Sequence, residues 1–421
     1  MNYKILINKD NPYNKSDFCN LKSEMVDGIL LDTKTKRAYL ELKKILEDKN
    51  ILIRLKKMDE DYFGEAFSLL SFDILVDNDL DDFTVIFEVL KDVGLILRYP
   101  LGKEEITGHS FCPYHFRYVG RSSAKIIMDN NLTLEEYDTL YNKSGVLLVN
   151  KPVGYSSFQV VNKIGHIFDT KKIGHNGTLD PTAEGLLVVT INKATKINEF
   201  LTCEDKEYIA SVKVGILTDT LDMEGKVLKR IDKHITKEMI VKLFKEFPLE
   251  YHQEVPIYSA IKIKGKKLYE YARNNIAIDL PKRLVKINEI QLLDVLDDSF
   301  SFRINVSKGT YIRSIIRDMG NMLGIPCTMA SLQRTRQGKF LLSDAYEVED
   351  IDINSKLISI KDALNVINVS VLDEDLSLVC NGHRVLNHYG VKDQVLFEKS
   401  GKIIGLYEVR DKYLVPLKMF K

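Results

Sequence analysis

The stretch GHNGTLDPTAEGLL, residues 174 to 187, places one carboxylate between two glycine-containing turns and directly before a proline. A residue that precedes proline is disfavoured in the helical conformation, so Asp180 is predicted to lie in an extended or turn segment. The apolar, β-branched run LLVVTI that follows, residues 186 to 191, is typical of a buried strand. A loop of this kind can present a single acid, although a lone Asp in a tight turn is also a common turn former or helix cap.

Length and composition indicate a globular chain of two or three domains. The 421 residues are 45% hydrophobic and 29% charged, which is enough to bury a large core. The formal net charge is zero, but residues 1 to 143 hold 20 Lys and Arg against 25 Asp and Glu. The remaining chain therefore carries a basic excess, which is compatible with a polyanionic partner and does not demand one.

The five cysteines are widely spaced and form no pairing pattern, which favours reduced thiols. The first 30 residues carry charges without a long apolar core, and no later run reaches the length of a membrane span. We therefore expect a cytoplasmic protein that does not contact a membrane, and we expect a monomer.

Residues 1 to 143 show both helical and strand patterns. Apolar residues recur at helical spacing from Lys34 to Leu46 and from Val85 to Val93, after which Gly94 is a natural helix end. Residues 95 to 99 (LILRY) are typical of a strand. These patterns predict an α+β domain.

The run RYPLGKEEITGHSFCPYHFRYVGRSSAKII, residues 98 to 127, resembles the VanY-type D-alanyl-D-alanine carboxypeptidases. These zinc enzymes bind the metal with a His, an Asp seven residues later and a distal His, and place a catalytic Glu three residues before the distal His. Asp73 and His115 match two of these positions, whereas the first ligand falls on Ala66 and the Glu on Cys112. The resemblance therefore implies a degenerate peptidase-like domain.

A catalytic zinc site needs about three protein ligands, an open position and a base for the bound water. Asp73 and His115 alone do not provide these. His109, Cys112 and His115, spaced by threes, could form a rewired metal site with Asp73, but this spacing in a proline-containing loop does not guarantee convergence. We expect a folded scaffold that binds no metal.

Residues 145 to 367 combine buried-strand patterns with amphipathic helices. The predicted elements are a strand over residues 145 to 152, helices that begin at Ser156 or Ser157 and at Thr236, a helix over 193 to 201, a half-buried strand over 206 to 216 and a helix that begins near Thr310.

Five motifs in this part occur in the same order as in the bacterial TruB-type tRNA pseudouridine synthases, which it closely resembles. They are GVLLVNKPVGYSS, KIGHNGTLDPTAEGLLVV, KEYIASVKVG, VPIYSAIKIKGKKLYEYAR and SKGTYIRSIIRDMG. The resemblance implies an α+β pseudouridine synthase fold with a mixed, mainly antiparallel sheet over residues 145 to 367, and a small PUA-like, RNA-binding β unit over residues 368 to 421. It also implies an enzyme that converts uridine 55 in the TΨC loop of tRNA to pseudouridine without a cofactor.

This isomerisation needs one nucleophilic carboxylate that stays ionised while the bond from N1 to the sugar breaks and the base rejoins through C5. A carboxylate in a dry pocket needs a nearby cation to stay charged. By resemblance, Asp180 is the nucleophile and Arg313 is its partner. Tyr208 matches the tyrosine that stacks on the base near the proton leaving C5, whereas without the motif it would fit a strand core equally well.

The target uridine lies inside a folded loop, so the enzyme must take the base out of its stack. The resemblance implies that His175 fills the vacated space, that Lys151 supports the active-site loop and that Leu332 lines the base pocket. From this leucine the chain continues as LQRTRQGKF, which differs from the Leu-Arg-Arg sequence that the family often has there. Asn176 replaces a common Thr, a small polar change that we expect to be tolerated.

Lysines and tyrosines interleave between residues 258 and 271, a composition that suits RNA backbone contacts and stacking on bases. A solvated basic face would have the same composition. The candidates for RNA binding are Tyr258, Lys264, Lys266 and Lys267, with Lys402, Arg410 and Lys412 in the C-terminal unit.

Two other classes of protein stay open from the sequence alone. A zinc peptidase with an accessory RNA domain conflicts with Ala66 and Cys112 at the ligand and catalytic positions. An RNA-binding protein without activity conflicts with the intact set of Asp180, Tyr208 and Arg313. The leading expectation is an RNA-modifying isomerase that binds the TΨC stem-loop of tRNA and carries a peptidase-like domain in front.

Overall fold

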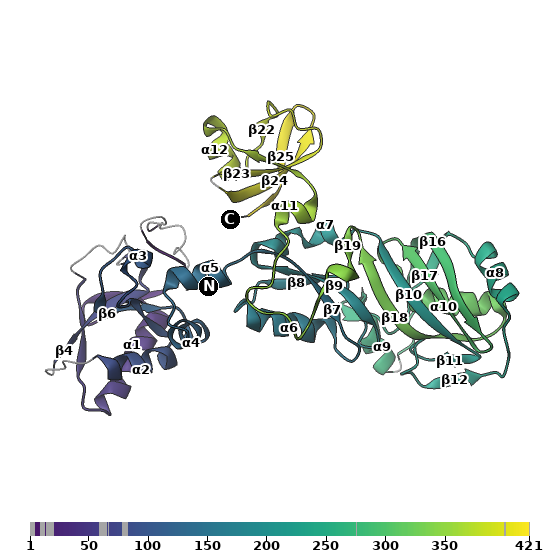
Figure 1. The fold of residues 1–421 in the computed structure, drawn as a ribbon, viewed down its shortest axis with the longest axis horizontal. Helices are drawn as coiled ribbons and strands as arrows, with labels where there is room; N and C mark the ends of the chain where they lie inside the picture. Colours follow the sequence, from purple (N-terminus) through teal and green to yellow (C-terminus); the bar gives the residue numbers. More distant parts are fainter. Residues whose placement is uncertain are drawn as a thin grey trace. The chain divides into compact units, whose positions relative to one another are not determined.

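The structure, a computed structural model, describes residues 5–8, 13, 21–58, 65, 67–77, 83–274, 276–399 and 401–420 (Figure 1). These residues form two compact units, Met1–Lys143 and Ser144–Lys421. Within the described part of the chain, no helix combines the length and the apolar character that a membrane span requires.

The first unit is built on a four-stranded antiparallel sheet in the order β3-β4-β6-β5. Its strands are β3 (Ile53–Lys56), β4 (Ser71–Val76), β5 (Leu95–Tyr99) and β6 (Cys112–Tyr118), preceded by a hairpin of β1 (Ser23–Val26) and β2 (Ile29–Asp32). Its helices are α1 (Thr33–Glu47), α2 (Thr84–Val93), α3 (Glu104–Thr107), α4 (Arg121–Asp129) and α5 (Leu134–Tyr141). Buried apolar side chains of α1, α2 and the sheet form one core.

The two helices and the strand predicted for this unit are confirmed. Helix α1 covers the predicted helical spacing, and α2 ends at Gly94, whose φ of 86° closes the helix in the left-handed conformation. Strand β5 coincides with residues 95 to 99, and all five of its side chains are buried.

Buried charged side chains of β4, β5 and β6 form a network with Glu65 and Glu135 in the first unit. The Arg98 guanidinium, which is fully buried, donates from Nε to Glu65 Oε1 (2.9 Å) and from Nη1 and Nη2 to the carboxylate of Glu135 (3.0 and 2.7 Å). His115 Nε2 lies 2.9 Å from Glu65 Oε2, and its Nδ1 lies 2.6 Å from Asp73 Oδ1. Although burial opposes it, these hydrogen bonds raise the pKa of His115, so its ring donates from both nitrogens.

The second unit contains a ten-stranded mixed sheet in the order β13-β16-β17-β10-β18-β9-β7-β20, with β19 on β18 and β8 on β9. All its pairs are antiparallel except β18 with β9 and β20 with β7, as the mainly antiparallel expectation required. The strands are β7 (Gly145–Lys151), β8 (Ile173–Asn176), β9 (Glu184–Ile191), β10 (Lys206–Val214), β13 (Glu250–Glu254), β16 (Lys282–Leu296), β17 (Ser299–Val306), β18 (Cys327–Gln337), β19 (Phe340–Leu341) and β20 (Tyr346–Glu347).

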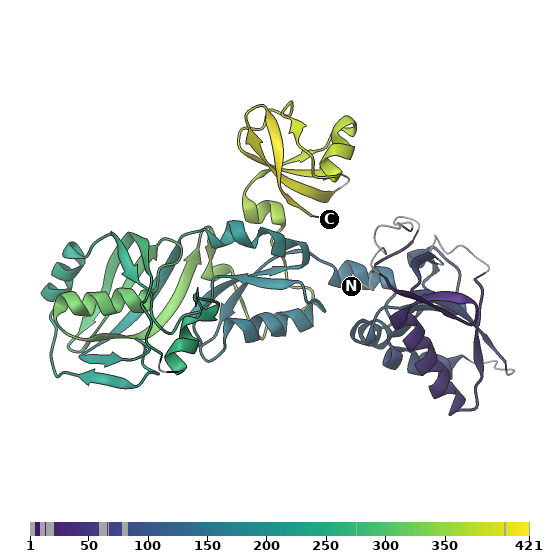
Figure 2. The same cartoon turned by 180° about the vertical axis from the view of Figure 1, so that it is seen from behind.

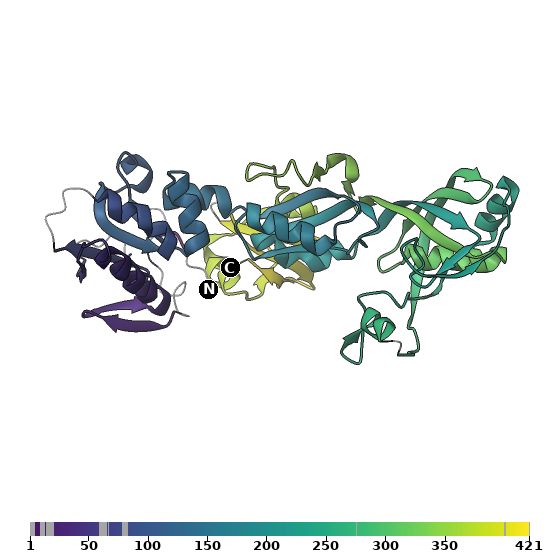
Figure 3. The same cartoon turned by 90° about the horizontal axis from the view of Figure 1, so that it is seen from below.

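Helices and short hairpins surround this sheet. The helices are α6 (Ser157–Ile167), the 3-10 helix η3 (Asn192–Ile197), α7 (Asn198–Thr202), α8 (Lys237–Glu246), α9 (Leu268–Arg273), α10 (Ile312–Leu323), the 3-10 helix η4 (Leu342–Asp344) and α11 (Ile360–Leu364). The hairpins are β11 (Ile216–Thr218) with β12 (Val227–Arg230), and β14 (Lys262–Ile263) with β15 (Lys266–Lys267). Seen from below, β14, β15 and α9 project from the sheet (Figure 3).

Three predicted elements of this unit differ in detail from the structure. The helix expected over 193 to 201 is a 3-10 helix followed by a short α-helix. The strand expected over 206 to 216 breaks at Gly215, where φ is 84° and a Cβ would meet Ile231 O at 2.3 Å. The helix expected near Thr310 begins at Ile312, because the Thr310 hydroxyl bonds Ser307 O (2.8 Å) in the preceding turn.

The C-terminal residues form a five-stranded sheet in the order β21-β23-β24-β25-β22, with helix α12 (Asp373–Cys380). The strands are β21 (Ile367–Ser370), β22 (Val385–Leu386), β23 (Gln394–Lys399), β24 (Lys402–Arg410) and β25 (Tyr413–Met419). Leu396, Leu406 and Phe420 share a core with side chains of β7, β9 and η3, so this sheet is fixed beside α7 and α11 (Figure 2).

We predict that Glu65→Gln destabilises the first unit by about 3–5 kcal/mol, because it leaves the buried cations Arg98, Arg117 and His115 with two carboxylates, Asp73 and Glu135, to balance them. Hydrogen exchange of peptides from β4 and β6 in the full chain should become about a hundredfold faster or more. Glu41→Gln is the control, since Glu41 pairs with Arg121 on the surface, where ion pairs contribute little. Equal exchange in the two variants would show that the buried network does not stabilise the unit.

Candidate active site

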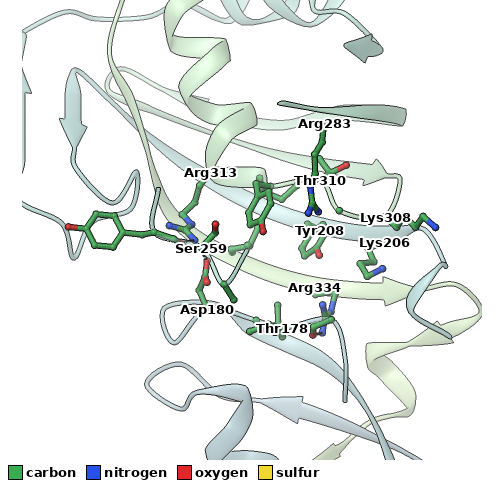
Figure 4. A pocket seen from close by; sticks show the side chains of 18 of the residues that line it. Thr178, Asp180, Lys206, Tyr208, Ser259, Arg283, Lys308, Thr310, Arg313 and Arg334 are labelled. Carbon is green, nitrogen blue, oxygen red and sulfur yellow. Dashed lines mark hydrogen bonds and ion pairs between the residues drawn. The ribbon is translucent and has the colours of Figure 1, made fainter. Parts of the chain in front are cut away.

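A cavity of about 860 Å³ opens beside strands β10 and β18 in the second unit (Figure 4). Its wall comes from the loop between β8 and β9, from β10, β16 and β18, from residues 258 to 260, and from the turn that leads into α10. Sequence segments that lie far apart therefore meet around one space. The cavity is large enough to receive a nucleoside-sized ligand.

Asp180 and Arg313 face each other in this cavity. Arg313 Nη2 lies 2.9 Å from Asp180 Oδ2, and the side chain of Arg313 is only 5% exposed, against 38% for Asp180. Backbone oxygens hold the guanidinium in place, since Nη1 donates to Thr220 O (2.9 Å) and Nη2 to Tyr258 O (3.0 Å). The positive charge is thus buried behind the carboxylate, which remains open to a ligand.

The loop that carries Asp180 is held at both sides by short polar contacts. The Ser157 hydroxyl accepts from Leu179 N (2.9 Å) and donates to Leu179 O (3.0 Å), directly before Asp180. Gly154 N donates to Pro181 O (2.8 Å), directly after it. Ser156, rather than Ser157, is the N-cap of α6, and this leaves the Ser157 hydroxyl available for the loop.

Lys151 supports this arrangement from below. Its side chain is fully buried, and Nζ donates to Pro152 O (2.8 Å) and Tyr155 O (2.7 Å) across the turn that contains Gly154. Burial lowers the pKa of Lys151 to about 8, although Asp180 and Glu184 oppose the shift. The Lys151 ammonium group therefore fixes the turn whose Gly154 N donates to Pro181 O. Lys151 itself is not among the described residues that line the cavity.

Tyr208 and Leu332 lie on neighbouring strands and both line the cavity. Tyr208 of β10 is 7% exposed and Leu332 of β18 is 8% exposed. Their burial gives the cavity an aromatic and aliphatic wall next to Asp180. Such a wall suits the faces of a planar base.

His175 lies in β8, close to the Asp180 loop but outside the set of described residues that line the cavity. Burial and the charge of Arg334 lower the pKa of His175, so its imidazole is neutral at pH 7. Asn176 beside it is fully buried and satisfied, since it donates to Asn198 Oδ1 (3.2 Å) and accepts from the Thr202 hydroxyl (3.0 Å).

The interleaved lysines and tyrosines divide between the cavity and a projecting hairpin. Tyr258 lines the cavity, whereas Lys264, Lys266 and Lys267 belong to the β14–β15 hairpin and lie outside its wall. Lys264 and Lys266 are exposed, and Lys267 Nζ donates to the hydroxyl of Tyr269 (3.2 Å). Of the predicted site residues, the structure thus places Asp180, Tyr208, Tyr258, Arg313 and Leu332 in the cavity wall. His175, Lys151 and the three lysines of the hairpin lie outside the described wall.

Four further cations line the cavity and escaped the sequence reasoning: Lys206, Arg283, Lys308 and Arg334. Arg334 is fully buried and donates to Leu186 O (2.6 Å) and Gly177 O (3.0 Å), at the two ends of the Asp180 loop. Burial, together with Arg334, lowers the pKa of Lys206 to about 8. A usable signal existed in the sequence, because Lys206 and Arg334 lie two residues from Tyr208 and Leu332, and side chains two residues apart on a strand share a face.

The residues of the possible rewired metal site do not converge. Asp73 and His115 meet, but both ring nitrogens of His115 are occupied by carboxylates, and His109 stacks on Tyr99 at 4.3 Å. Among the residues that the structure describes, no three His, Cys, Asp or Glu side chains form a group that could hold a metal. Cys112 is buried nearby, and Ala66 lies outside the described residues.

Comparisons with known proteins place this geometry in a family. Residues 165–312 match the TruB family pseudouridylate synthase (N terminal domain). The tRNA pseudouridine synthase B of Clostridium tetani is 41% identical over 278 residues, which cover 64% of this chain and 94% of that protein. The tRNA pseudouridine synthase B of Mesoplasma florum is 36% identical over 270 residues, 63% of this chain and 94% of that protein.

Among solved structures, a Cbf5-Nop10-Gar1 complex matches 67% of this chain and 87% of the compared chain, with 25% identity and a TM-score of 0.50. An H/ACA RNP bound to a substrate RNA containing 2'-deoxyuridine matches 68% and 87%, with 22% identity and a TM-score of 0.50, and supports the fold alone. From the extent of the curated matches, the chain belongs to the TruB family of pseudouridylate synthases.

Proposed function

We propose that this protein is a tRNA pseudouridine synthase that isomerises uridine 55 in the TΨC loop of tRNA. The observation that carries the proposal is the Asp180 carboxylate, paired at 2.9 Å with a buried arginine and open to a nucleoside-sized cavity. The similarity to proteins named tRNA pseudouridine synthase B, over nearly their whole length, supports tRNA as the substrate.

The reaction follows from what each side chain can do. Asp180 acts as the nucleophile while the bond from N1 to the ribose breaks. The sugar is then held by Asp180 through a new carbon–oxygen bond. The detached uracil turns within the cavity, C5 forms the new bond to the sugar and displaces the Asp180 carboxylate, C5 loses its proton and N1 gains one. Arg313 pairs with the Asp180 carboxylate and orients it toward the sugar, and Tyr208 stacks on the base near C5. The reaction replaces the bond from N1 to the sugar by a bond from C5 and moves one proton from C5 to N1. It therefore needs no oxidant, reductant or cofactor.

The base must leave its stack before it can reach Asp180, because the carboxylate lies inside a cavity. We assign His175 to the space that the base vacates, Leu332 and Tyr258 to the wall around the base, and Lys151 to support of the loop. The exposed Lys264 and Lys266, with Lys267, are placed on a projecting hairpin where contacts to phosphates are possible. The C-terminal sheet, which we interpret as a PUA-like unit, would add Lys402, Arg410 and Lys412.

For the first unit we infer a degenerate, VanY-like peptidase scaffold over residues 1 to 143, in front of a catalytic domain over 145 to 367. The support is the His-Phe-Arg-Tyr-Val-Gly string, whose first four residues lie on β6 with His115 opposite Asp73 in the strand register. The carboxylates of Asp73 and Glu65 occupy both ring nitrogens of His115, so neither nitrogen is open to a metal. We therefore assign this unit no hydrolytic role.

Asp180→Asn should abolish pseudouridine formation and leave tRNA affinity within a few fold of wild type. The amide keeps the volume but cannot attack the sugar, whereas most affinity comes from phosphate contacts. The measurement is chemical mapping of pseudouridine in unmodified tRNA, with filter binding alongside it. Asp350→Asn, an exposed Asp of the same unit, is the control and should be fully active. Appreciable turnover by Asp180→Asn would exclude Asp180 as the nucleophile.

Arg313→Lys should lower the single-turnover rate by about a hundredfold or more. A lysine keeps the charge, but it cannot bond Thr220 O, Tyr258 O and Asp180 at once as the planar guanidinium does. Arg317→Lys, one helical turn further along α10, is the matched control, because its guanidinium contacts Glu254 and Asp318 outside the cavity. A normal rate for Arg313→Lys would mean that the geometry of the pair is not required.

Residues 144 to 421 alone should modify tRNA at a rate close to that of the full chain. Every residue that lines the described cavity lies in this unit, and the acidic first unit would repel RNA. The rates of the two proteins are compared under single-turnover conditions. A folded fragment that binds tRNA without turning it over would show that the first unit completes the active site.

A further inference from the structure

Two exposed aromatic side chains lie beside the catalytic loop of the second unit. Among the Tyr and Phe side chains that the structure describes in this unit, Tyr155 and Phe158 are the most exposed, at 39% and 73%. Val153, in the same turn between β7 and α6, is 57% exposed. Single exposed apolar side chains are common on proteins, but three within one turn beside a functional loop are typical of an interaction surface. We call Val153, Tyr155 and Phe158 the apolar shoulder.

Hydrogen bonds fix the backbone of the apolar shoulder. Lys151 Nζ donates to Tyr155 O (2.7 Å) from below. Ser156 and Gln159 form a capping box at the start of α6, in which Gln159 N donates to Ser156 Oγ (3.2 Å) and Ser156 N donates to Gln159 Oε1 (2.8 Å). Because the backbone is already held, a ligand that covers the two rings loses little affinity to ordering the turn.

The apolar shoulder is continuous with the loop that carries Asp180. The Ser157 hydroxyl contacts both N and O of Leu179, and Phe158 follows Ser157 directly. The bonds and contacts along this path place the Cα atoms of Phe158 and Asp180 at most about 15 Å apart. None of the three shoulder residues belongs to the described wall of the cavity. A ligand that enters the cavity therefore reaches the shoulder with a neighbouring group and not with the group that reacts.

The chemistry of the apolar shoulder indicates the class of ligand. When a target base leaves its stack, the unpaired bases next to it lose a stacking partner. Aromatic side chains replace such a partner, because every base has a flat face, and this stacking tolerates different sequences. Residues 152–159 contain no charged side chain, so the surface suits the face of a base and not a phosphate.

We propose that the apolar shoulder stacks on an unpaired base of the RNA loop, next to the nucleotide that enters the cavity. The proposal rests on the proposed function, in which the target uridine is taken out of a folded loop. The contact restores part of the stacking that is lost when the uridine leaves, and Phe158, as the most exposed ring, supplies most of it. The apolar shoulder thereby stabilises the bound loop in its opened form.

The test is Phe158→Ala in the full chain, with binding measured in the Asp180→Asn background so that no product forms. Leu296→Ala is the matched control, because Leu296 is 60% exposed at the end of β16 and lies outside the described cavity wall. We expect the Kd for the TΨC stem-loop to weaken about tenfold for Phe158→Ala and less than twofold for Leu296→Ala. Both variants should keep the thermal stability of the wild-type chain, since the truncated side chains are exposed.

Two further variants separate stacking from a general apolar contact. Phe158→Leu keeps an apolar side chain without a flat ring and should bind as weakly as Phe158→Ala. Phe158→Trp offers a larger ring and should bind at least as tightly as the wild-type chain. Equal Kd values for the leucine and tryptophan variants would overturn the proposal.

A thermodynamic cycle identifies the base that stacks on Phe158. Stem-loops in which one unpaired loop nucleotide at a time, other than the target uridine, lacks its base are titrated with and without Phe158→Ala. At one position the missing base should weaken binding about tenfold when Phe158 is present and less than twofold in Phe158→Ala, because both changes remove the same contact. Losses that multiply at every position would show that no base stacks there.

Failure of this proposal can be distinguished from failure of the proposed function. If the wild-type chain forms no pseudouridine, the proposed function fails, while the cycle of Kd values still decides on the apolar shoulder. If the wild-type chain is active and Phe158→Ala binds the stem-loop as Leu296→Ala does, only the shoulder proposal fails.

Discussion

The three acceptors around the Arg313 guanidinium determine the geometry of the catalytic domain. Two are backbone oxygens, of Thr220 and Tyr258, and the third is the carboxylate of Asp180. One side chain on α10 thus fixes the loop after β11, the segment before β14 and the loop between β8 and β9. Because the guanidinium is buried and the carboxylate is not, the charge that stabilises the acid lies behind it and leaves its open side to the ligand.

Hydrogen bonds from neighbouring residues hold the Asp180 loop in place next to this pair. Ser157 holds Leu179, Gly154 holds Pro181, and Arg334 bonds carbonyls on both sides of the loop. Gly185 must be a glycine, since its φ is 102° and a Cβ would lie 2.4 Å from Arg334 O, where β9 and β18 pair in parallel. The first unit shows a different use of buried charge, because Arg98, Arg117 and His115 balance the carboxylates of Glu65, Glu135 and Asp73.

Sequence patterns predicted those parts of the fold that depend on local periodicity. β5 and α2 with its Gly94 end follow from apolar spacing and turn residues, whereas the mainly antiparallel sheet was implied by the family resemblance. The motifs brought Asp180 and Arg313 together as a hypothesis, and the 2.9 Å contact agrees with it. The break at Gly215 depends on the close approach of Ile231, and the cavity positions of Arg283 and Lys308 depend on contacts between distant segments, which no local window contains.

The most direct measurement is to incubate the full chain with unmodified tRNA and to map every uridine chemically for conversion. Our account predicts that one uridine, at position 55 in the TΨC loop, becomes pseudouridine without any added cofactor. An unmodified position 55 in tRNA that the protein demonstrably binds, or conversion confined to other uridines, would contradict it.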